Sequence, residues 1–203
     1  MAKNIYCIGR NYAEHAKELG NEVPQAPVVF LKPTHALALE PKTIALPSIS
    51  KDVHHEVELV LILGPRKSNQ PQVQSFAVGI DLTARDLQSE AKKKGLPWVL
   101  AKGLKGFAPI GRIIPAAPGE NFQNFEVGIE VDGQTRQKGS TRDLIFSIPT
   151  LLAYLDEHFG LDEGDLIFTG TPPGVSALKS GQKIRAWVQS AQGEKSELIA
   201  SIS

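Results

Sequence analysis

The chain has 203 residues, of which 41% are hydrophobic and 22% are charged, so it is long enough to form one sizeable hydrophobic core. Its 22 lysines and arginines balance its 22 aspartates and glutamates, and the formal net charge is zero. This neutrality argues against a nucleic-acid partner and against an anionic membrane surface. We expect a single domain over residues 1–203 that binds a small molecule.

The N-terminal stretch MAKNIYCIGRNY lacks the long apolar segment of a secretory signal, and the single cysteine, Cys7, cannot form an internal disulfide. No apolar run approaches the roughly 20 residues that a membrane-spanning helix requires. The sequence therefore predicts a cytoplasmic protein with no membrane partner.

Short strands connected by turns dominate the predicted elements, because 14 prolines and 18 glycines are spread along the chain. Asn11 followed by Glu14 is typical of a helix start, and we expect this helix to end near Gly20. In chain order, the sequence predicts a strand at 5–9, the helix at 11–20, strands at 27–33, 55–63 and 76–81, a helix at 83–95, a hairpin at 125–139, a helix at 148–160, and strands at 164–170 and 183–190.

Two of these elements carry specific end signals. Thr83 and Asp86 are typical of a helix start, and Gly95 follows three lysines that are placed favourably for the helix dipole. We therefore interpret Asp86 as a structural residue of this helix start. Asp132 with Gly133 predicts the tight turn of a β-hairpin.

The stretch HHEVELVLIL places two glutamates directly ahead of an apolar run. Because side chains alternate across a strand, Glu56 and Glu58 point the same way, roughly 7 Å apart, while Val57, Leu59 and Leu61 face a core. Like charges this close repel each other unless a cation lies between them. The pair is either a solvated strand face or part of a metal site, and a third ligand elsewhere would favour the metal site.

Asp81 is the candidate for this third ligand, because it ends an apolar strand just before a helix. On local grounds it could equally cap that helix. Three carboxylates offer only oxygen ligands, which suit Mg²⁺ or Mn²⁺ better than Zn²⁺. His54 shares the face of the glutamates and could also be a ligand, although a histidine that orients a ligand is the commoner case.

Five motifs, HHEVELVLIL, VGIDLTARDLQ, KGLPWVLAKG, IFSIPTLLAYL and GDLIFTGTPPGV, occur in that order over nearly the whole chain. With these motifs the sequence resembles the fumarylacetoacetate hydrolase family, in particular the short single-domain form of its acylpyruvase and oxaloacetate decarboxylase branch. The resemblance implies a strand-dominated α+β fold, a mixed β-sandwich roll with a few short helices, assembled as a homodimer. It also implies that the substrate is a small 2-oxo or 2,4-dioxo acid.

The same resemblance implies roles for individual residues. It implies that Glu56, Glu58 and Asp81 bind the metal, Mg²⁺ or Mn²⁺, and that Lys102 is an active-site residue. It implies substrate binding by Arg10 and Gln88. It also implies that His15 and Glu18 lie on a lid helix within residues 11–20.

From the residues alone, each of these roles has a structural alternative. Lys102 could be a surface lysine that keeps its ammonium in water. His15 and Glu18 lie three apart on one helical face, so they could be a general base with its orienting carboxylate or simply an exposed pair. If their helix is a lid, we expect it to order over the metal only when substrate binds.

The turn TGTPPGV offers further contacts to an acid. Its Thr169, Gly170 and Thr171 could donate hydrogen bonds to a substrate carboxylate, although a turn rich in glycine and proline is ordinarily just a turn. Two positions depart from the family pattern, since Lys105 stands where an acid is common and Ser176 where glycine is common. These departures leave the identity of the substrate open.

Three functions are compatible with these residues. A 2-oxo acid can chelate a divalent cation, so the charge that develops on an enolate lies next to the metal. The preferred hypothesis is hydrolysis of a C–C bond in an acylpyruvate, with His15 and Glu18 activating water and Lys102 stabilising the leaving enolate. The alternatives are decarboxylation of oxaloacetate or isomerisation of 2-hydroxyhepta-2,4-diene-1,7-dioate at the same metal site, and a metal-holding binding protein without catalysis.

Overall fold

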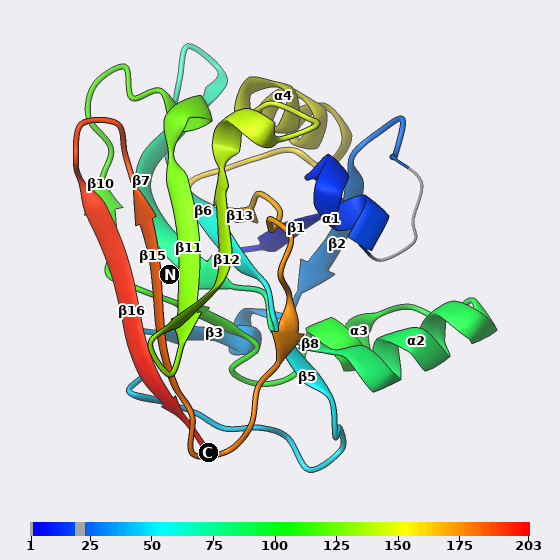
Figure 1. Cartoon of the computed structure of the whole chain (residues 1–203). Coiled ribbons are helices and arrows are strands. Elements are labelled where there is room, and N and C mark those ends of the chain that lie inside the picture. The colour runs from blue at the N-terminus through cyan, green and yellow to red at the C-terminus, as the bar shows by residue number, and fades with distance from the viewer. Residues whose placement is uncertain (1, 19–22) are drawn as a thin grey trace.

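The computed structural model describes residues 2–18 and 23–203, and its main feature is two β-sheets packed face to face (Figure 1). The central strands β6 and β7 of the larger sheet contact β11, β15 and β16 of the smaller one. Both parallel and antiparallel pairs occur in each sheet. The strand-dominated α+β fold class that the sequence predicts is confirmed.

The larger sheet consists mainly of strands from the first 115 residues of the chain, together with β13 from the C-terminal part. In sheet order its strands are β2 (Val28–Lys32), β1 (Ile5–Gly9), β13 (Leu166–Phe168), β6 (Val57–Lys67), β7 (Gln70–Ile80), β9 (Ala108–Ile110) and β3 (Leu37–Leu39), with β10 (Ile114–Pro115) paired to β7.

The second sheet comes mainly from the C-terminal half, and a third, very short sheet lies beside it. The second sheet has the order β12 (Gln134–Ser140), β11 (Glu126–Val131), β15 (Lys183–Gln189), β16 (Lys195–Ile202) and β4 (Thr43–Ile44), and the third has the order β14 (Ser176–Ala177), β5 (Val53–His55) and β8 (Thr83–Ala84).

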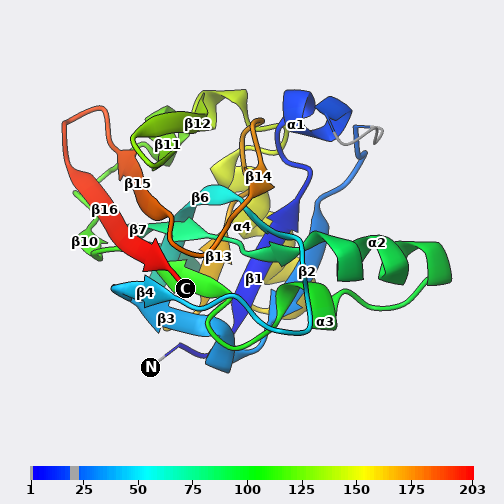
Figure 2. The same cartoon turned by 60° about the horizontal axis from the view of Figure 1, so that its bottom comes forward.

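The helices lie around the sheets, and α2 and α3 pack against each other at one side of the molecule (Figure 2). None of the helices in the described part of the chain is long and apolar enough to span a bilayer. The helices are α1 (Ala13–Glu18), α2 (Arg85–Lys94), α3 (Val99–Lys102) and α4 (Ile148–Phe159), with short 3-10 turns η1 (Thr34–Ala36), η2 (Phe122–Asn124) and η3 (Thr141–Asp143).

Strand β6 is buried on both of its faces, which explains its continuous apolar run. Val57, Leu59 and Leu61 belong to the main core between the two large sheets, as the alternation predicts. Val60 belongs to a second apolar cluster on the opposite face. Glu58 shares the face of Val60, so the interpretation of this face as solvated is wrong.

Two predicted end signals are confirmed, because they rest on backbone conformations that few residues adopt. Asp132 and Gly133 have φ values of 52° and 74°, the left-handed pair that a two-residue hairpin between β11 and β12 needs. Gly95 ends α2 with φ of 64°. Both turns follow directly from local sequence.

The predicted helix starts at 11 and 83 are each two residues too early, since α1 begins at Ala13 and α2 at Arg85. The N-terminal cap of α2 is Ala84, and its side chain makes no capping bond. Asp86 instead accepts hydrogen bonds from Ser50 Oγ at 2.6 Å and from Lys51 N at 2.9 Å. It therefore ties α2 to the loop before β5, a structural role as predicted.

Asn11 anchors two loops. Its Oδ1 accepts from Phe146 N at 2.8 Å, and its Nδ2 donates to Thr169 O at 2.8 Å. Helix α1 is shorter than predicted at its start, and its expected end near Gly20 lies outside the described residues. Asn11 thus fixes the loop that follows β13 next to the start of α1.

Candidate metal centre

Three carboxylates meet at one end of the β6–β7 pair. Glu56 lies in the break between β5 and β6, Glu58 lies within β6, and Asp81 follows the last residue of β7. Asp81 N donates to Glu56 O at 2.8 Å, and this bond brings the end of β7 alongside the break. One oxygen from each side chain lies within 4.8 Å of the other two, and all three residues are buried.

A buried ammonium group lies inside this acidic cluster. Lys102 Nζ, at the end of α3, donates to Glu56 Oε2 at 2.8 Å and to Asp81 Oδ2 at 2.5 Å. Burial alone would lower the pKa of Lys102, but the negative charges of Asp81 and Glu56 outweigh it and raise the pKa above its usual value. Lys102 is therefore a fixed cation, and the interpretation of it as a surface lysine is wrong.

Lys32 is a second buried ammonium group, one that the predicted site did not include. It ends β2, and its Nζ lies 2.7 Å from Asp81 Oδ1. The same group donates to Phe107 O at 2.8 Å, to Leu82 O at 3.2 Å and to the carbonyl of Lys102. One signal was available, since a lysine at the end of the apolar strand VVFLK must find partners if the strand is buried.

Glu58 is held by the loop after β13. Gly170 N donates to its Oε2 at 2.7 Å. Burial first, and then the charge of Asp81, raise the pKa of Glu58 well above its usual 4.5, although the Gly170 bond opposes this shift. The ionised form of Glu58 is therefore unfavourable unless a further cation joins the cluster.

The raised pKa of Glu58 predicts how stability depends on pH without added metal. The folded chain keeps a proton that the unfolded chain loses above its usual carboxyl pKa of 4.5. The resulting stabilisation is present below that pH and is lost as the pH rises through the folded-state pKa. We expect urea midpoints to fall over this range in the parent, and a flatter profile in Glu58→Gln; equal profiles would contradict the assignment.

The acidic cluster fits a small hard cation. Its donors are carboxylate oxygens only, and Mg²⁺ prefers such oxygens at about 2.1 Å, which puts opposite ligands about 4.2 Å apart. The three carboxylate oxygens lie within 4.8 Å of one another, which is compatible with a cation of this size. Asp81 Oδ1 is buried and accepts no hydrogen bond from the described residues, although it is paired with Lys32.

His54 is not part of this cluster. Its Nε2 lies 2.9 Å from Asp52 Oδ1, at the start of β5. The described metal-ligand cluster contains only Glu56, Glu58 and Asp81. The interpretation of His54 as a ligand therefore has no geometric support.

The donors predicted for a substrate carboxylate have partners within the protein. Thr169 Oγ1 donates to Leu59 O at 2.9 Å, and Thr171 Oγ1 donates to Val57 O at 2.8 Å. Gly170 N donates to Glu58. In the structure these three residues position β6 and the Glu58 carboxylate, and their role toward substrate stays a prediction.

Gln137 on β12 links the same loop to the metal cluster, and it too was absent from the predicted site. Its Oε1 accepts from Val57 N at 3.1 Å and lies 2.8 Å from His55 Nδ1. Its Nε2 donates to Thr171 Oγ1 at 2.8 Å and to Pro172 O at 2.7 Å. One buried amide therefore holds the strand between Glu56 and Glu58 against the loop that bears Gly170.

Replacing Gln137 with alanine should destabilise the fold by about 2–4 kcal/mol, because several buried donors and acceptors lose a partner at once. Urea unfolding measures this effect. Gln134→Ala is the matched control on the same strand, since Gln134 is exposed. Equal midpoints for the two variants would show that the Gln137 network contributes nothing.

Gln88 and Arg85 lie on one face of α2 next to the cluster. Arg85 Nη2 donates to Glu56 Oε1, and Arg85 Nη1 donates to Gln88 Oε1 at 2.7 Å. Gln88 is buried and contacts the cluster through Arg85, and its role in substrate binding stays a prediction. Arg10 follows β1 with a left-handed φ of 57°, a rare conformation for arginine that often marks functional positions.

The predicted base pair is only partly described. Glu18 ends α1, and its carboxylate accepts from Gly174 N at 3.1 Å. This bond attaches α1 to the turn TGTPPGV. The side chain of His15 lies outside the described part of the chain, so the pairing of His15 with Glu18 and the lid over 11–20 stay predictions.

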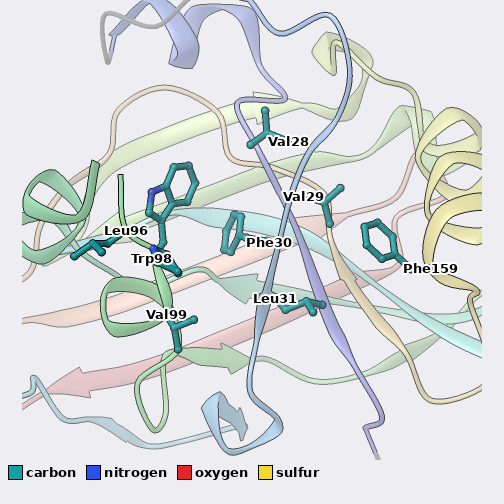
Figure 3. A pocket seen from close by; sticks show the side chains of 9 residues that line it. Val28, Val29, Phe30, Leu31, Leu96, Trp98, Val99 and Phe159 are labelled. Atoms are coloured by element: carbon teal, nitrogen blue, oxygen red, sulfur yellow. The ribbon is translucent and has the colours of Figure 1, made fainter. Parts of the chain in front are cut away.

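Figure 3 shows an apolar groove of about 480 Å³, and one of its lining residues, Phe30, also contacts Lys102 of the cluster. Its lining contains no carboxylate, so it is not itself a site for a metal-bound acid. Phe30 separates the two, because its ring faces the groove while its centroid lies 5.0 Å from Lys102 Nζ. The lining residues are Val28, Val29, Phe30, Leu31, Leu96, Pro97, Trp98, Val99 and Phe159.

Curated relatives share this chain over most of its length. The mitochondrial oxaloacetate tautomerase of Arabidopsis thaliana is 48% identical over 190 residues, which cover 91% of this chain and 85% of the relative. The mitochondrial oxaloacetate decarboxylase of Dictyostelium discoideum is 44% identical over 193 residues, covering 92% and 88%. These mitochondrial names contradict the predicted cytoplasmic location, which is therefore wrong.

Solved structures and a family model agree with these relatives. The fumarylpyruvate hydrolase of Pseudomonas aeruginosa, solved with Mn²⁺ and pyruvate, superposes with a TM-score of 0.89 at 33% identity, covering 100% of this chain and 91% of that one. The family model for the fumarylacetoacetate (FAA) hydrolase C-terminal region matches residues 4–198. The chain therefore belongs to the fumarylacetoacetate hydrolase family.

Proposed function

We propose that the chain is a divalent-metal-dependent enzyme that interconverts the enol and keto forms of oxaloacetate, with decarboxylation of the same acid as a side reaction. The main support is the buried Lys102 ammonium between Glu56 and Asp81. Relatives at 48% and 44% identity are named for these two reactions on oxaloacetate. This proposal replaces hydrolysis as the preferred function.

Glu56, Glu58 and Asp81 would hold Mg²⁺ or Mn²⁺, which when bound supplies a Lewis acid for the 2-oxo group of the substrate. The Mn²⁺ in the fumarylpyruvate hydrolase structure supports a metal of this kind. Lys32 and Arg85 each neutralise one of the carboxylates, which keeps the buried charge of the cluster balanced. The three carboxylates thus form a buried acidic site.

Lys102 is the residue we expect to contact the reacting atoms. An ammonium group has three donors, and Glu56 and Asp81 accept two of them. The third can donate to a substrate oxygen on which enolate charge develops. Because its pKa is raised, Lys102 stays protonated and acts as a donor, so the proton on C3 must go to another base. The predicted pair of His15 and Glu18 is our candidate.

A substrate comparison tests this proposal. Metal-stripped protein is given Mg²⁺ or Mn²⁺, and its turnover is measured on enol-oxaloacetate, acetylpyruvate and 2-hydroxyhepta-2,4-diene-1,7-dioate. We expect metal-dependent loss of the enol absorbance of oxaloacetate to exceed turnover of the other two acids. Oxaloacetate that ketonises no faster than in buffer with the same metal would overturn the proposal.

Hydrolysis of an acylpyruvate is the second candidate. It is favoured by the similarity to the fumarylpyruvate hydrolase and by the position of Glu18, which brings α1 to the loop next to Glu58. Hydrolysis needs an activated water, whereas tautomerisation does not. Cleavage of acetylpyruvate that exceeds oxaloacetate turnover and disappears in His15→Ala would make hydrolysis the main activity.

A further inference from the structure

Positive charge extends from the metal cluster along one face of α2. Arg85, Gln88 and Lys92 are spaced three and four residues apart, so they lie on the same side of this helix. Arg85 and Gln88 reach the cluster through the bond to Glu56. Lys92 lies one turn further out on this face, toward the solvent.

Trp98 holds Lys92 at this position. The Lys92 ammonium lies 5.4 Å from the centroid of the Trp98 ring, a cation–π contact. Trp98 precedes α3, and its carbonyl accepts from Lys102 N at 2.9 Å, so one helical turn separates it from Lys102. Trp98 also packs edge-on against Phe30, whose ring faces Lys102 Nζ. The two lysines therefore flank one aromatic pair.

No carboxylate in the described part of the chain forms a salt bridge with Lys92. Lys32, Arg85 and Lys102 are already paired with two carboxylates of the cluster, Glu56 and Asp81. In the described residues, Lys92 makes no ion pair, and neither does Arg10. Burial, and then the charges of Arg10 and Arg85, lower the pKa of Lys92, while the charge of Glu56 acts in the opposite direction. An anion placed among these cations would be stabilised.

We propose that Lys92, together with Arg10, binds the second carboxylate of oxaloacetate and thereby favours tautomerisation over decarboxylation. This inference rests on the proposed function, in which the first carboxylate and the 2-oxo group lie at the acidic cluster. Lys92 is a substrate-binding residue that determines specificity for a dicarboxylic 2-oxo acid.

The two reactions treat this second carboxylate differently. In ketonisation the enol O–H loses its proton, its electron pair forms the C2=O bond, and the C2=C3 pair takes a proton at C3; the C4 carboxylate keeps its charge. In decarboxylation the C3–C4 bond breaks, its electron pair forms the enolate, and C4 leaves as neutral CO₂. A cation on the C4 carboxylate stabilises the bound substrate and the transition state of ketonisation. It stabilises the transition state of decarboxylation less, because the C4 group loses its charge there.

The test compares Lys92→Gln with Lys93→Gln, which changes the next lysine of the same exposed helix segment and leaves the Lys92 face unchanged. With the Mn²⁺-loaded protein, we expect Lys92→Gln to raise KM for enol-oxaloacetate about tenfold, as loss of one charge-assisted hydrogen bond predicts. The amount of pyruvate formed by decarboxylation, per molecule of enol-oxaloacetate consumed, should rise several-fold. KM for acetylpyruvate, which has a single carboxylate, should stay unchanged.

A binding measurement separates this inference from the proposed function. 3,3-Difluorooxaloacetate has no proton on C3, and oxalate has no carboxylate beyond the chelating pair. Calorimetry should show about tenfold weaker binding of the difluoro acid to Lys92→Gln than to Lys93→Gln, with equal binding of oxalate. This result without oxaloacetate turnover in the parent would support the carboxylate site and reject the proposed function.

The opposite pattern would reject the inference alone. If the parent turns over oxaloacetate, but Lys92→Gln and Lys93→Gln agree in KM, product ratio and binding of the difluoro acid, Lys92 does not contact the second carboxylate. Melting temperatures of both variants that equal that of the parent would confirm that the comparison involves folded proteins.

Discussion

Replacing Lys102 with methionine is expected to lower turnover by about 10²- to 10⁴-fold, because the substitution removes the ammonium nearest to the developing enolate charge. Without added metal, the variant should also lose about 3–5 kcal/mol of stability, since Glu56 and Asp81 lose a buried partner. Saturating Mn²⁺ should restore much of this stability by binding the same carboxylates. Urea unfolding with and without Mn²⁺ measures both effects.

The matched control is Lys105→Met, which changes an exposed lysine three residues further on. It should leave turnover and unfolding close to those of the parent. If Lys102→Met keeps a tenth or more of parental turnover, Lys102 does not contact the reacting atoms. If Mn²⁺ stabilises this variant less than it stabilises the parent, Lys102 is not paired with the metal-binding carboxylates.

Replacing Glu58 with glutamine should weaken Mn²⁺ binding by at least about 100-fold, more than the 10- to 100-fold typical of residues that only support a ligand. The side chain keeps its volume and an oxygen that can accept from Gly170 N, so the fold should be retained. Turnover at limiting Mn²⁺ should fall in proportion to metal occupancy. Calorimetric titration with Mn²⁺ gives the affinity directly.

Glu126→Gln is the control for charge alone, because Glu126 is exposed on β11. It should bind Mn²⁺ as the parent does. If Glu58→Gln binds Mn²⁺ as tightly as the parent does, Glu58 is not a metal ligand. That result would remove the basis for the proposed mechanism.

Local sequence signals were sufficient for most of the architecture. The hairpin at Asp132 and Gly133 and the end of α2 at Gly95 depend on backbone conformations encoded at those positions. The helix starts predicted at 11 and 83 are two residues early, and the side chains of Asn11 and Asp86 form long-range hydrogen bonds that local rules do not predict. The homodimer implied by the family resemblance remains a prediction.

The sequence could indicate which carboxylates meet but not which cations join them. Alternation placed Glu56 and Glu58 on one face, and the strand end brought in Asp81. Lys32 lies 49 positions before Asp81 and reaches it only because β2, β1, β13 and β6 are neighbours in one sheet. Gln137 reaches Val57 from the opposite sheet, and no local pattern marks it.

The choice among hydrolysis, decarboxylation and tautomerisation could not be made from motifs, because all three use a metal-bound 2-oxo acid and differ in what happens to the group beyond C3. In the binding mode that we propose, this group lies toward α2, where Lys92 and Trp98 are adjacent in space but six positions apart in the chain. Only the packing of α2 against α3 brings them together. Specificity therefore depends on tertiary contacts that periodicity does not reveal.

The most direct test of the metal-dependent enolisation site measures the rate of enol-oxaloacetate ketonisation while Mn²⁺ is added back to metal-stripped protein. The parent and Glu58→Gln are titrated in parallel. We expect the parental rate to rise and saturate at one Mn²⁺ per chain, while Glu58→Gln requires at least about 100-fold more Mn²⁺. A parental rate that is independent of Mn²⁺, or identical titration curves for the two proteins, would contradict an enolisation site built from Glu56, Glu58 and Asp81.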